Sequence, residues 1–260
     1  MSSLPISLNN CDIEPIHIPG KIQPHGFLVA VDHSGLVQFV SDNATHFLSK
    51  NIDTLLLGKS LADLEIFFAA NVPAGYFTAL ISKAVASGNF YEINPVKIKL
   101  GEQDIHVILS ASSNYYLLEF EPMVSTQYTS INKRLSYAIP QMLVEKNLLK
   151  LLENTAAEIS NIIGYDRVMV YRFAKDGHGE VIAEVKNDHL EPFLGLHYPA
   201  TDIPKQARDL YKISLTRLIN DVNSIAADLI TEAKNDTQLD LSFSQLRAVS
   251  PIHKIGRAHV

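Results

Sequence analysis

A single cysteine, Cys11, stands near the start of this 260-residue chain, in the segment CDIEPIHIPGKIQPHG. This segment covers residues 11–26 and carries three prolines, so it is interpreted as an irregular arm and not as a helix. A thiol on a solvent-reachable arm can attack an electrophile, whereas a thiol buried in a core cannot. The acidic neighbours Asp12 and Glu14 are expected to raise the pKa of this thiol, so an incidental surface cysteine is also consistent with the local chemistry.

Two histidines of the arm, His17 and His25, could also bind or react. They are separated by proline, and neither a C-x-x-C nor an H-x-x-x-H pattern occurs in the chain. A zinc site needs several ligands at set spacing. The sequence therefore predicts no metal site, and both histidines are interpreted as side chains that hydrogen-bond the backbone where the arm packs.

A denser group of polar and aromatic residues lies in HYPATDIPKQARDLY, residues 197–211. Asp202 precedes an expected helix start at Pro204, where the helix dipole favours a carboxylate, so simple capping is one interpretation. A lining for a flat anionic ligand is the other, because aromatics, one acid and several arginines occur together. The flanking residues are Tyr198, Arg208, Tyr211 and Arg217.

A third segment, LRAVSPIH at residues 246–253, contains further groups that suit a carboxylate ligand. Arg247 and Ser250 bind carboxylates well, and the segment ends in His253. Ordinary turn chemistry is the other explanation, since Ser-Pro is common in turns.

The composition restricts the class of protein that positions these residues. At 47% hydrophobic residues, the chain can bury one large core or two modest ones. A net charge of −6 gives no basis for nucleic acid or an anionic membrane as a partner. One cysteine excludes an internal disulfide, and the first ten residues lack the basic and apolar regions of a signal peptide. We therefore expect a cytoplasmic protein with no membrane span.

Periodicity and turn residues predict an α+β chain of two domains, each an antiparallel sheet flanked by helices. The predicted ranges are an arm at 1–26, a first domain at 27–122, a linker at 123–135 and a second domain at 136–260. In the first domain, strands flank His33-Ser34-Gly35 and three more strands occupy 94–122, with helices at 51–64 and 74–88.

The second predicted domain starts with a helix over 143–163 that Gly164 ends. A hairpin follows at 166–188 with Asp176-Gly177 in its turn. Another helix is predicted over 203–222, because Pro204 suits a first helical position.

Four segments together resemble the N-terminal region of bacteriophytochromes, in which a PAS domain precedes a GAF domain. They are CDIEPIHIPGKIQPHG, YDRVMVYRFAKDGHGEVIAE, LGLHYPATDIPKQARDLY and SPIH, in the family's order over about residues 8–253. The resemblance implies a red/far-red photoreceptor that holds a linear tetrapyrrole and signals by Z/E photoisomerisation. It implies no catalysis by this region.

The same resemblance implies that Cys11 forms a thioether with the ring A side chain of biliverdin, as in bacterial and fungal members. Plant and cyanobacterial members use a cysteine immediately before the GAF histidine, and here Ile252 holds that position. The arm would thread a loop that comes from residues between Arg217 and Ser250, with Ile22 as the threaded residue.

Other roles are implied position by position. The Asp202 carbonyl would accept hydrogen bonds from pyrrole N–H groups, and His253 would bond a pyrrole water and a propionate. The propionates would be bound by Arg217, Arg247 and Ser250. The rings would be lined by Met169, Tyr171, Tyr198, Ile203 and Tyr211.

Two other functions stay open. A PAS–GAF module that binds no bilin could serve as an interaction or dimerisation fragment, and helices near 140–163 would suit a homodimer. A cysteine-dependent enzyme could pair Cys11 with His17 or His25, although the local charge disfavours a thiolate and no oxyanion-hole motif is visible.

The C-terminal end departs from the family pattern. Gly256 stands where the family usually has tyrosine, and KIGRAHV does not resemble family sequence. The sequence therefore predicts a GAF domain that is incomplete at its C-terminus, from a truncated or misjoined frame. The PHY domain and the histidine-kinase output module of full-length members would be absent.

Overall fold

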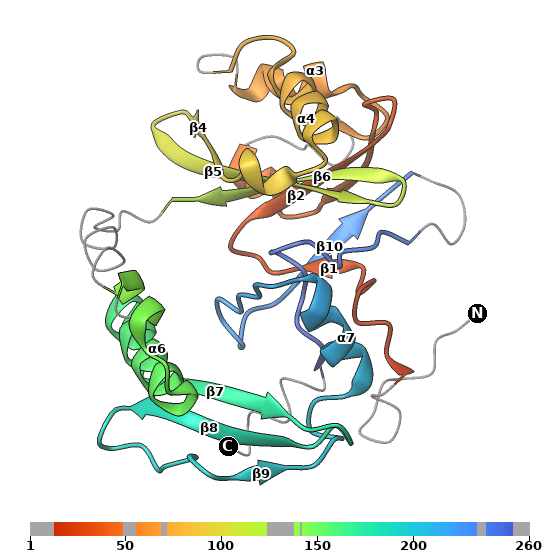
Figure 1. The fold of residues 1–260 in the computed structure, drawn as a ribbon. Helices are drawn as coiled ribbons and strands as arrows, with labels where there is room; N and C mark the ends of the chain where they lie inside the picture. The colour runs from red at the N-terminus through yellow and green to blue at the C-terminus, as the bar shows by residue number, and fades with distance from the viewer. Residues whose placement is uncertain are drawn as a thin grey trace. The chain divides into compact units, whose positions relative to one another are not determined.

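The computed structural model describes residues 13–48, 56–68, 72–123, 138–140, 142–232 and 238–251. The chain divides into two compact units, Met1–Val124 with Asp209–Val260, and Ser125–Arg208. Each unit contains an antiparallel sheet with helices, so the predicted α+β class is confirmed (Figure 1). This division groups residues 209–260 with the first unit, and the domain ranges 27–122 and 136–260 stay a prediction.

The sheet of the first unit has seven strands in the order β1-β10-β3-β2-β6-β5-β4. Every neighbouring pair is antiparallel. The bounds are Lys21–Ile22 (β1), Phe27–Asp32 (β2), Val37–Ser41 (β3), Val96–Leu100 (β4), Gln103–Ser112 (β5), Tyr115–Pro122 (β6) and Ala227–Ile230 (β10). The hairpin of β2 and β3 and the three strands expected at 94–122 are thus confirmed.

Helices cover one face of this sheet (Figure 1). They are α1 (Ala44–Leu48), α3 (Leu61–Glu65), α4 (Tyr76–Ser87) and the 3-10 turns η2 (Ile66–Phe68) and η3 (Phe90–Glu92). Gly88 ends α4 in the left-handed conformation at φ 66°, as predicted. The helix expected at 51–64 is present at its end as α3, and its first five residues lie outside the described ranges.

Both faces of strand β2 are buried, which explains its nearly unbroken apolar sequence. Phe27 and Val29 pack into the core under α3 and α4, where the Phe27 ring stacks on Phe120 with 4.5 Å between centroids. Leu28 and Ala30 face a second core on the opposite side. That second core also takes side chains from the arm and from the C-terminal segment, namely Ile22, Ala227, Leu239, Leu241 and Leu246.

The N-terminal arm enters the first unit as strand β1. On one side β1 pairs with β10, and on the other Ile22 bridges to Arg247. The Gln23 amide donates to the Leu246 carbonyl at 2.6 Å, and Ile22 is fully buried. The arm therefore lies between two parts of the segment that follows Arg217, with Ile22 at the centre.

The second unit packs helix α6 (Leu148–Ile163) on a three-stranded sheet. The strands are β7 (Arg167–Phe173), β8 (Gly179–Lys186) and β9 (His197–Tyr198). Gly164 ends α6 at φ 70°, as predicted, but the helix starts at Leu148 instead of residue 143, because Asn147 caps it by accepting the Lys150 amide. The predicted hairpin is confirmed by the pairing of β7 and β8.

The helix predicted over 203–222 is wrong in length, because α7 covers only Lys205–Ile213. Beyond it, the Leu218 carbonyl accepts the Gln23 side-chain amide at 2.9 Å. The Asn220 amide donates to the same side chain at 3.0 Å. These backbone groups serve tertiary contacts that a continued helix would forbid, and such contacts outweigh helix propensity.

Candidate functional site

The residues that the sequence singled out fall into separate groups. Cys11 and His253 lie outside the described residues. The second unit holds Met169, Tyr171, Tyr198, Asp202 and Ile203. The first unit holds Tyr211, Arg217, Arg247 and Ser250.

In the second unit, two tyrosines meet across the sheet. Tyr171 on β7 and Tyr198 on β9 have ring centroids 6.0 Å apart, and the Phe173 ring lies 5.1 Å from Tyr171. Burial raises the pKa of Tyr171, and the charge of Asp202 and the neighbouring Tyr198 act in the same direction. The Tyr171 hydroxyl therefore stays protonated at neutral pH and can donate a hydrogen bond. Met169 on the same strand is 41% exposed.

The position of Tyr171 depends on a glycine that sequence reasoning missed. A Cβ atom at Gly179 would lie 2.0 Å from the Tyr171 ring, so any side chain there would displace it. The strand register also shifts here: Val170 pairs with Ala183 but Tyr171 with Val181, which leaves Ile182 as the extra residue. Such bulges redirect side chains next to functional sites.

The loop before β9 is held by a buried carboxylate. Glu184 on β8 accepts the amides of Phe193 and Leu194 at 2.9 and 3.1 Å and pairs with Arg167 at 2.5 Å. The Arg167 guanidinium also lies 3.7 Å above the Phe193 ring. This clamp fixes the approach of the chain to Tyr198.

The turn that carries Asp202 is fixed by Arg208. The Asp202 amide donates to the Pro199 carbonyl at 3.0 Å. The Arg208 guanidinium donates to the carbonyls of Ala200, at 2.9 Å, and Ile203. No hydrogen bond to the Asp202 carboxylate or main-chain carbonyl is present in the described part of the chain, so capping of α7 by Asp202 is not seen.

In the first unit, Arg217 is turned toward main-chain oxygens. It donates to the carbonyls of Gln245 at 3.3 Å, Arg247 at 2.5 Å and Ala248 at 3.2 Å. Burial, followed by the charge of Arg247, lowers the pKa of Arg217 to about 10. Arg217 therefore stays charged at neutral pH while it holds the segment 245–248.

Arg247 is the more available cation of the pair. The residue is only 7% exposed, and its Nη1 has no hydrogen-bond partner among the described residues. Burial lowers the pKa of Arg247, against the favourable charges of Asp240 and Tyr211. A buried guanidinium N–H group without an acceptor is costly, and a bound anion would remove that cost. The pair thus offers a site for a carboxylate.

Ser250 connects this region to the arm. Its hydroxyl donates to the Glu14 carboxylate at 2.6 Å. Glu14 follows Cys11 by three residues in the sequence. The start of the described arm therefore lies against the segment that carries Arg247.

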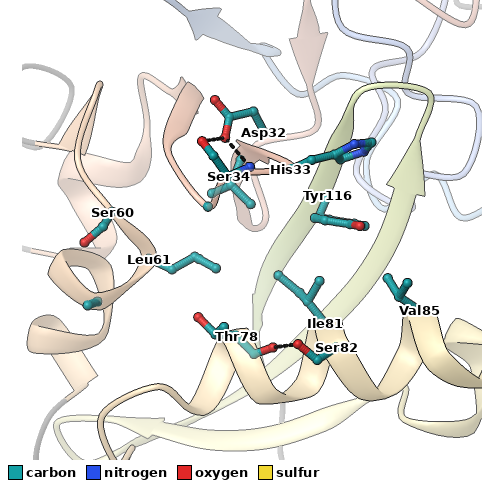
Figure 2. A pocket seen from close by; sticks show the side chains of 13 residues that line it. Asp32, His33, Ser34, Ser60, Leu61, Thr78, Ile81, Ser82, Val85 and Tyr116 are labelled. Atoms are coloured by element: carbon teal, nitrogen blue, oxygen red, sulfur yellow. Dashed lines mark hydrogen bonds between the residues drawn. The ribbon is translucent and has the colours of Figure 1, made fainter.

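A separate cavity of about 330 Å³ lies between the β2–β3 turn and α4 (Figure 2). Its Asp32 carboxylate accepts the amides of Ser34 and Leu36 and the side chain of Gln38. These bonds hold the turn, and they lower the pKa of Asp32 against the opposing effect of burial. None of the sequence-predicted site residues lines this cavity.

Within the described ranges, no helix combines the length and the apolar character that a membrane crossing requires. No cluster of three or more histidine, cysteine, aspartate or glutamate side chains there is arranged to hold a metal ion.

Comparisons with known proteins agree on one family. Residues 11–123 match the family model described as a PAS fold. The chain is 37% identical to a bacteriophytochrome of Pseudomonas aeruginosa, over 97% of this chain and 34% of that protein. It is 37% identical to cyanobacterial phytochrome B of Nostoc sp., over 95% of this chain and 33% of that protein. The chain spans about a third of the length of these curated relatives.

Solved structures give the same answer. The wild-type chromophore-binding domain of a Stigmatella aurantiaca phytochrome superposes with a TM-score of 0.82 at 31% identity, over 96% of this chain and 82% of that one. The chromophore-binding domain of an unusual bacteriophytochrome from R. palustris superposes with a TM-score of 0.81 at 32% identity, over 96% and 80% of the two chains. The fold is therefore a PAS domain followed by a GAF-like domain.

Proposed function

Because this chain belongs to the phytochrome family of photoreceptors, we propose that it binds a linear tetrapyrrole and forms the light-sensing part of a red/far-red receptor. The observation that carries the proposal is the buried guanidinium of Arg247, whose Nη1 lacks a partner among the described residues, beside Arg217. A bilin carries propionate carboxylates, and arginine binds carboxylates in two-pronged geometry.

Biliverdin is the proposed bilin, and Cys11 the proposed point of attachment. The thiol would add across the vinyl group of ring A, so that sulfur bonds one carbon and the proton goes to the other. The Ser250–Glu14 hydrogen bond supports this, because it holds the arm just after Cys11 against the segment of Arg247. Proximity would replace intrinsic reactivity of the thiol.

The other residues are proposed to bind the bilin by charge and shape. Arg217, Arg247 and Ser250 would receive the propionates. The Asp202 carbonyl, which has no partner in the described part of the chain, would accept pyrrole N–H groups, and His253 would act with it. Met169, Tyr171, Tyr198, Ile203 and Tyr211 would line the rings.

When bound, a bilin supplies absorption of red light and a double bond beside ring D that isomerises. The protein then has to offer two alternative sets of hydrogen bonds. Tyr171, Tyr198 and Asp202 suit this, because the acid and the two hydroxyls lie within electrostatic reach of one another. Two arrangements of these groups would be the two signalling states.

The setting of the domain is part of the same proposal. The family resemblance implies that the signal would pass through a PHY domain to an output module such as a histidine kinase, in the cytoplasm. This region itself would perform no catalysis. A homodimer would form through α6, which exposes Leu148, Leu149, Ile159 and Ile163.

A second candidate is an interaction fragment that binds no bilin. The apolar residues exposed on α6 favour it, since they suit helix-to-helix contact whether or not a pigment is bound.

Biliverdin binding distinguishes the two candidates. The chain should be incubated with biliverdin, denatured, and examined for pigment that remains attached. We expect a red-absorbing band that survives denaturation, is lost in Cys11→Ser and is retained in the control Ser113→Ala, an exposed turn residue. Red and far-red illumination should then give opposite difference spectra. Protein that stays colourless with biliverdin would rule out the photoreceptor and leave the interaction fragment.

A further inference from the structure

We infer that Glu119 is a positioning residue, whose carboxylate on strand β6 holds the segment Ser244–Leu246 and thereby sets the Arg247 guanidinium. The part of this inference that concerns ligand affinity rests on the proposed function. The part that concerns the segment itself does not.

Three donors of one short segment converge on the Glu119 carboxylate. The Ser244 hydroxyl donates at 2.5 Å, the Gln245 amide at 3.1 Å and the Leu246 amide at 2.8 Å. Glu119 itself is fully buried in the middle of the sheet, between Leu28 of β2 and Ile108 of β5. A buried carboxylate that accepts several N–H and O–H groups fixes their positions strongly.

The opposite edge of the same segment pairs with the arm. The Leu246 carbonyl accepts the Gln23 amide at 2.6 Å, and the Ala248 amide donates to the Lys21 carbonyl at 3.1 Å. Arg247, between these two positions, has its backbone held from both sides. Glu119 therefore anchors the segment from the sheet while the arm pairs with it from the other side.

Apolar packing of Leu246 also holds the segment Ser244–Leu246 against the sheet. A Cβ atom at Gly26 would lie 2.6 Å from the Phe120 carbonyl and 3.1 Å from the Leu246 side chain. Leu246 is fully buried in the second core of the first unit. The segment thus has one apolar anchor and one carboxylate anchor directly before Arg247.

Burial destabilises the ionised form of the Glu119 carboxyl group. It raises the pKa of Glu119 to about 7, although the three hydrogen bonds act in the opposite direction. Arg217, whose charge favours the ionised carboxylate, lies within electrostatic reach. A buried carboxylate in this place, despite the free-energy cost of its burial, is consistent with a role in positioning Arg217 and Arg247.

The first unit offers a matched control in Glu65. This side chain is also buried, and it accepts the amides of Gly75 and Phe77 at 2.6 and 2.8 Å. Its bonds hold the entry to α4 and do not touch the segment 244–246. Glu119→Gln and Glu65→Gln therefore make the same substitution at two buried carboxyl groups that accept comparable hydrogen bonds in different places.

The test combines hydrogen exchange of the bilin-free chain with biliverdin titration. In Glu119→Gln we expect amide exchange at Gln245 and Leu246 to rise about tenfold and biliverdin affinity to fall about tenfold, because the glutamine amide has one acceptor oxygen where the carboxylate uses two. Glu65→Gln should leave both measurements at the wild-type level. Ser244→Ala should give a smaller change in the same direction, and Ser244→Thr, which keeps the hydroxyl, should restore it.

Unchanged exchange at Gln245 and Leu246 in Glu119→Gln would overturn the inference, and so would equal effects of Glu65→Gln on these amides. If Glu119→Gln does not fold, unchanged exchange in Ser244→Ala has the same meaning. A wild-type chain that binds no biliverdin ends the proposed function, but the exchange measurement still decides the positioning role of Glu119.

Discussion

The Asn220 amide donates a hydrogen bond of 3.0 Å to the side-chain oxygen of Gln23, a residue 197 positions earlier in the chain. The Gln23 side-chain amide donates to the Leu218 carbonyl at 2.9 Å, and the residue is 3% exposed. One side chain of the arm therefore satisfies backbone groups on the far segment that the arm must meet. Bringing together two segments so far apart in the sequence costs conformational entropy. This hydrogen bond therefore adds to the stability of the fold only where other contacts already order the two segments.

Replacement of this side chain isolates the contribution of the contact. Gln23→Leu keeps the approximate size but leaves the Asn220 amide and the Leu218 carbonyl without their partner, so the free energy of unfolding should fall by about 1–3 kcal/mol. Urea denaturation measures it, and Gln103→Leu, at an exposed position, is the control. Equal stability of the two variants would mean that water replaces the Gln23 contacts.

Local signals were sufficient for most of the regular elements. The β-rich runs of Phe27–Asp32 and Val37–Ser41, the glycine ends of α4 and α6, and the turn at Asp176-Gly177 are all encoded within a few residues. The physical cause is also local, since a left-handed cap or a tight turn depends on the residue that adopts it.

Contacts between distant segments were not predictable in the same way. Strand β10, at Ala227–Ile230, adds to the sheet beside β3, a pairing that no nearby residue indicates. The helix predicted to reach residue 222 stops at Ile213, because Leu218 and Asn220 bind Gln23 instead. The pairing of β10 and the end of α7 both depend on residues near the opposite end of the chain.

The residues of the candidate site also divide into those that the sequence indicated and those that only the fold brings into place. Resemblance supplied the residues that would touch a bilin, but not those that hold them in place. Gly179 was missed because only the fold places it under Tyr171. Glu119 had one available signal, a charged residue between the apolar Leu118 and Phe120 in a strand buried on both faces. Inward-pointing charges in such strands indicate a specific partner.

The contact of Gly179 with Tyr171 predicts a strong coupling between the two positions. Gly179→Ala should lower the free energy of unfolding by about 1–3 kcal/mol, because the new methyl group overlaps the Tyr171 ring. In a Tyr171→Ala background the same change should cost far less, and a double-mutant cycle by urea denaturation measures the difference. Equal costs in both backgrounds would show that the Tyr171 ring moves away without penalty.

Removal of the buried Arg247 charge should change the stability of the bilin-free protein and its affinity for biliverdin in opposite directions. Arg247→Met replaces a buried charge, one of whose N–H groups lacks an acceptor among the described residues, with an apolar chain of similar length, so the bilin-free protein should gain about 1 kcal/mol of unfolding free energy. Biliverdin affinity should fall about tenfold or more, since a charged contact to a carboxylate is lost. Thermal denaturation and absorbance titration measure the two effects, with the exposed Arg172→Met as control. Lower stability together with full affinity would contradict the proposed role of Arg247.

The buried carboxyl of Glu119 predicts a specific dependence of stability on pH. Burial raises its pKa from 4.5 to about 7 in the folded chain. The folded state therefore holds this proton more tightly than the unfolded state, and the resulting stabilisation is complete below pH 4.5 and is lost as the pH rises through about 7. Glu121, whose pKa burial also raises, acts in the same direction, whereas Arg217 favours the ionised form of Glu119.

Glu119→Gln removes this one titration and leaves the others in place. The difference in unfolding free energy between the wild-type chain and Glu119→Gln should therefore change steadily across that pH range, with the wild type losing stability relative to the variant, and stay constant at higher pH. Urea denaturation at several pH values between 5 and 8.5 would measure it, at about half-unit steps. Glu121→Gln separates the contribution of the second acid. Parallel curves for the wild type and Glu119→Gln would mean that the carboxyl keeps its ordinary pKa, and that the three donors of Ser244–Leu246 fully offset its burial.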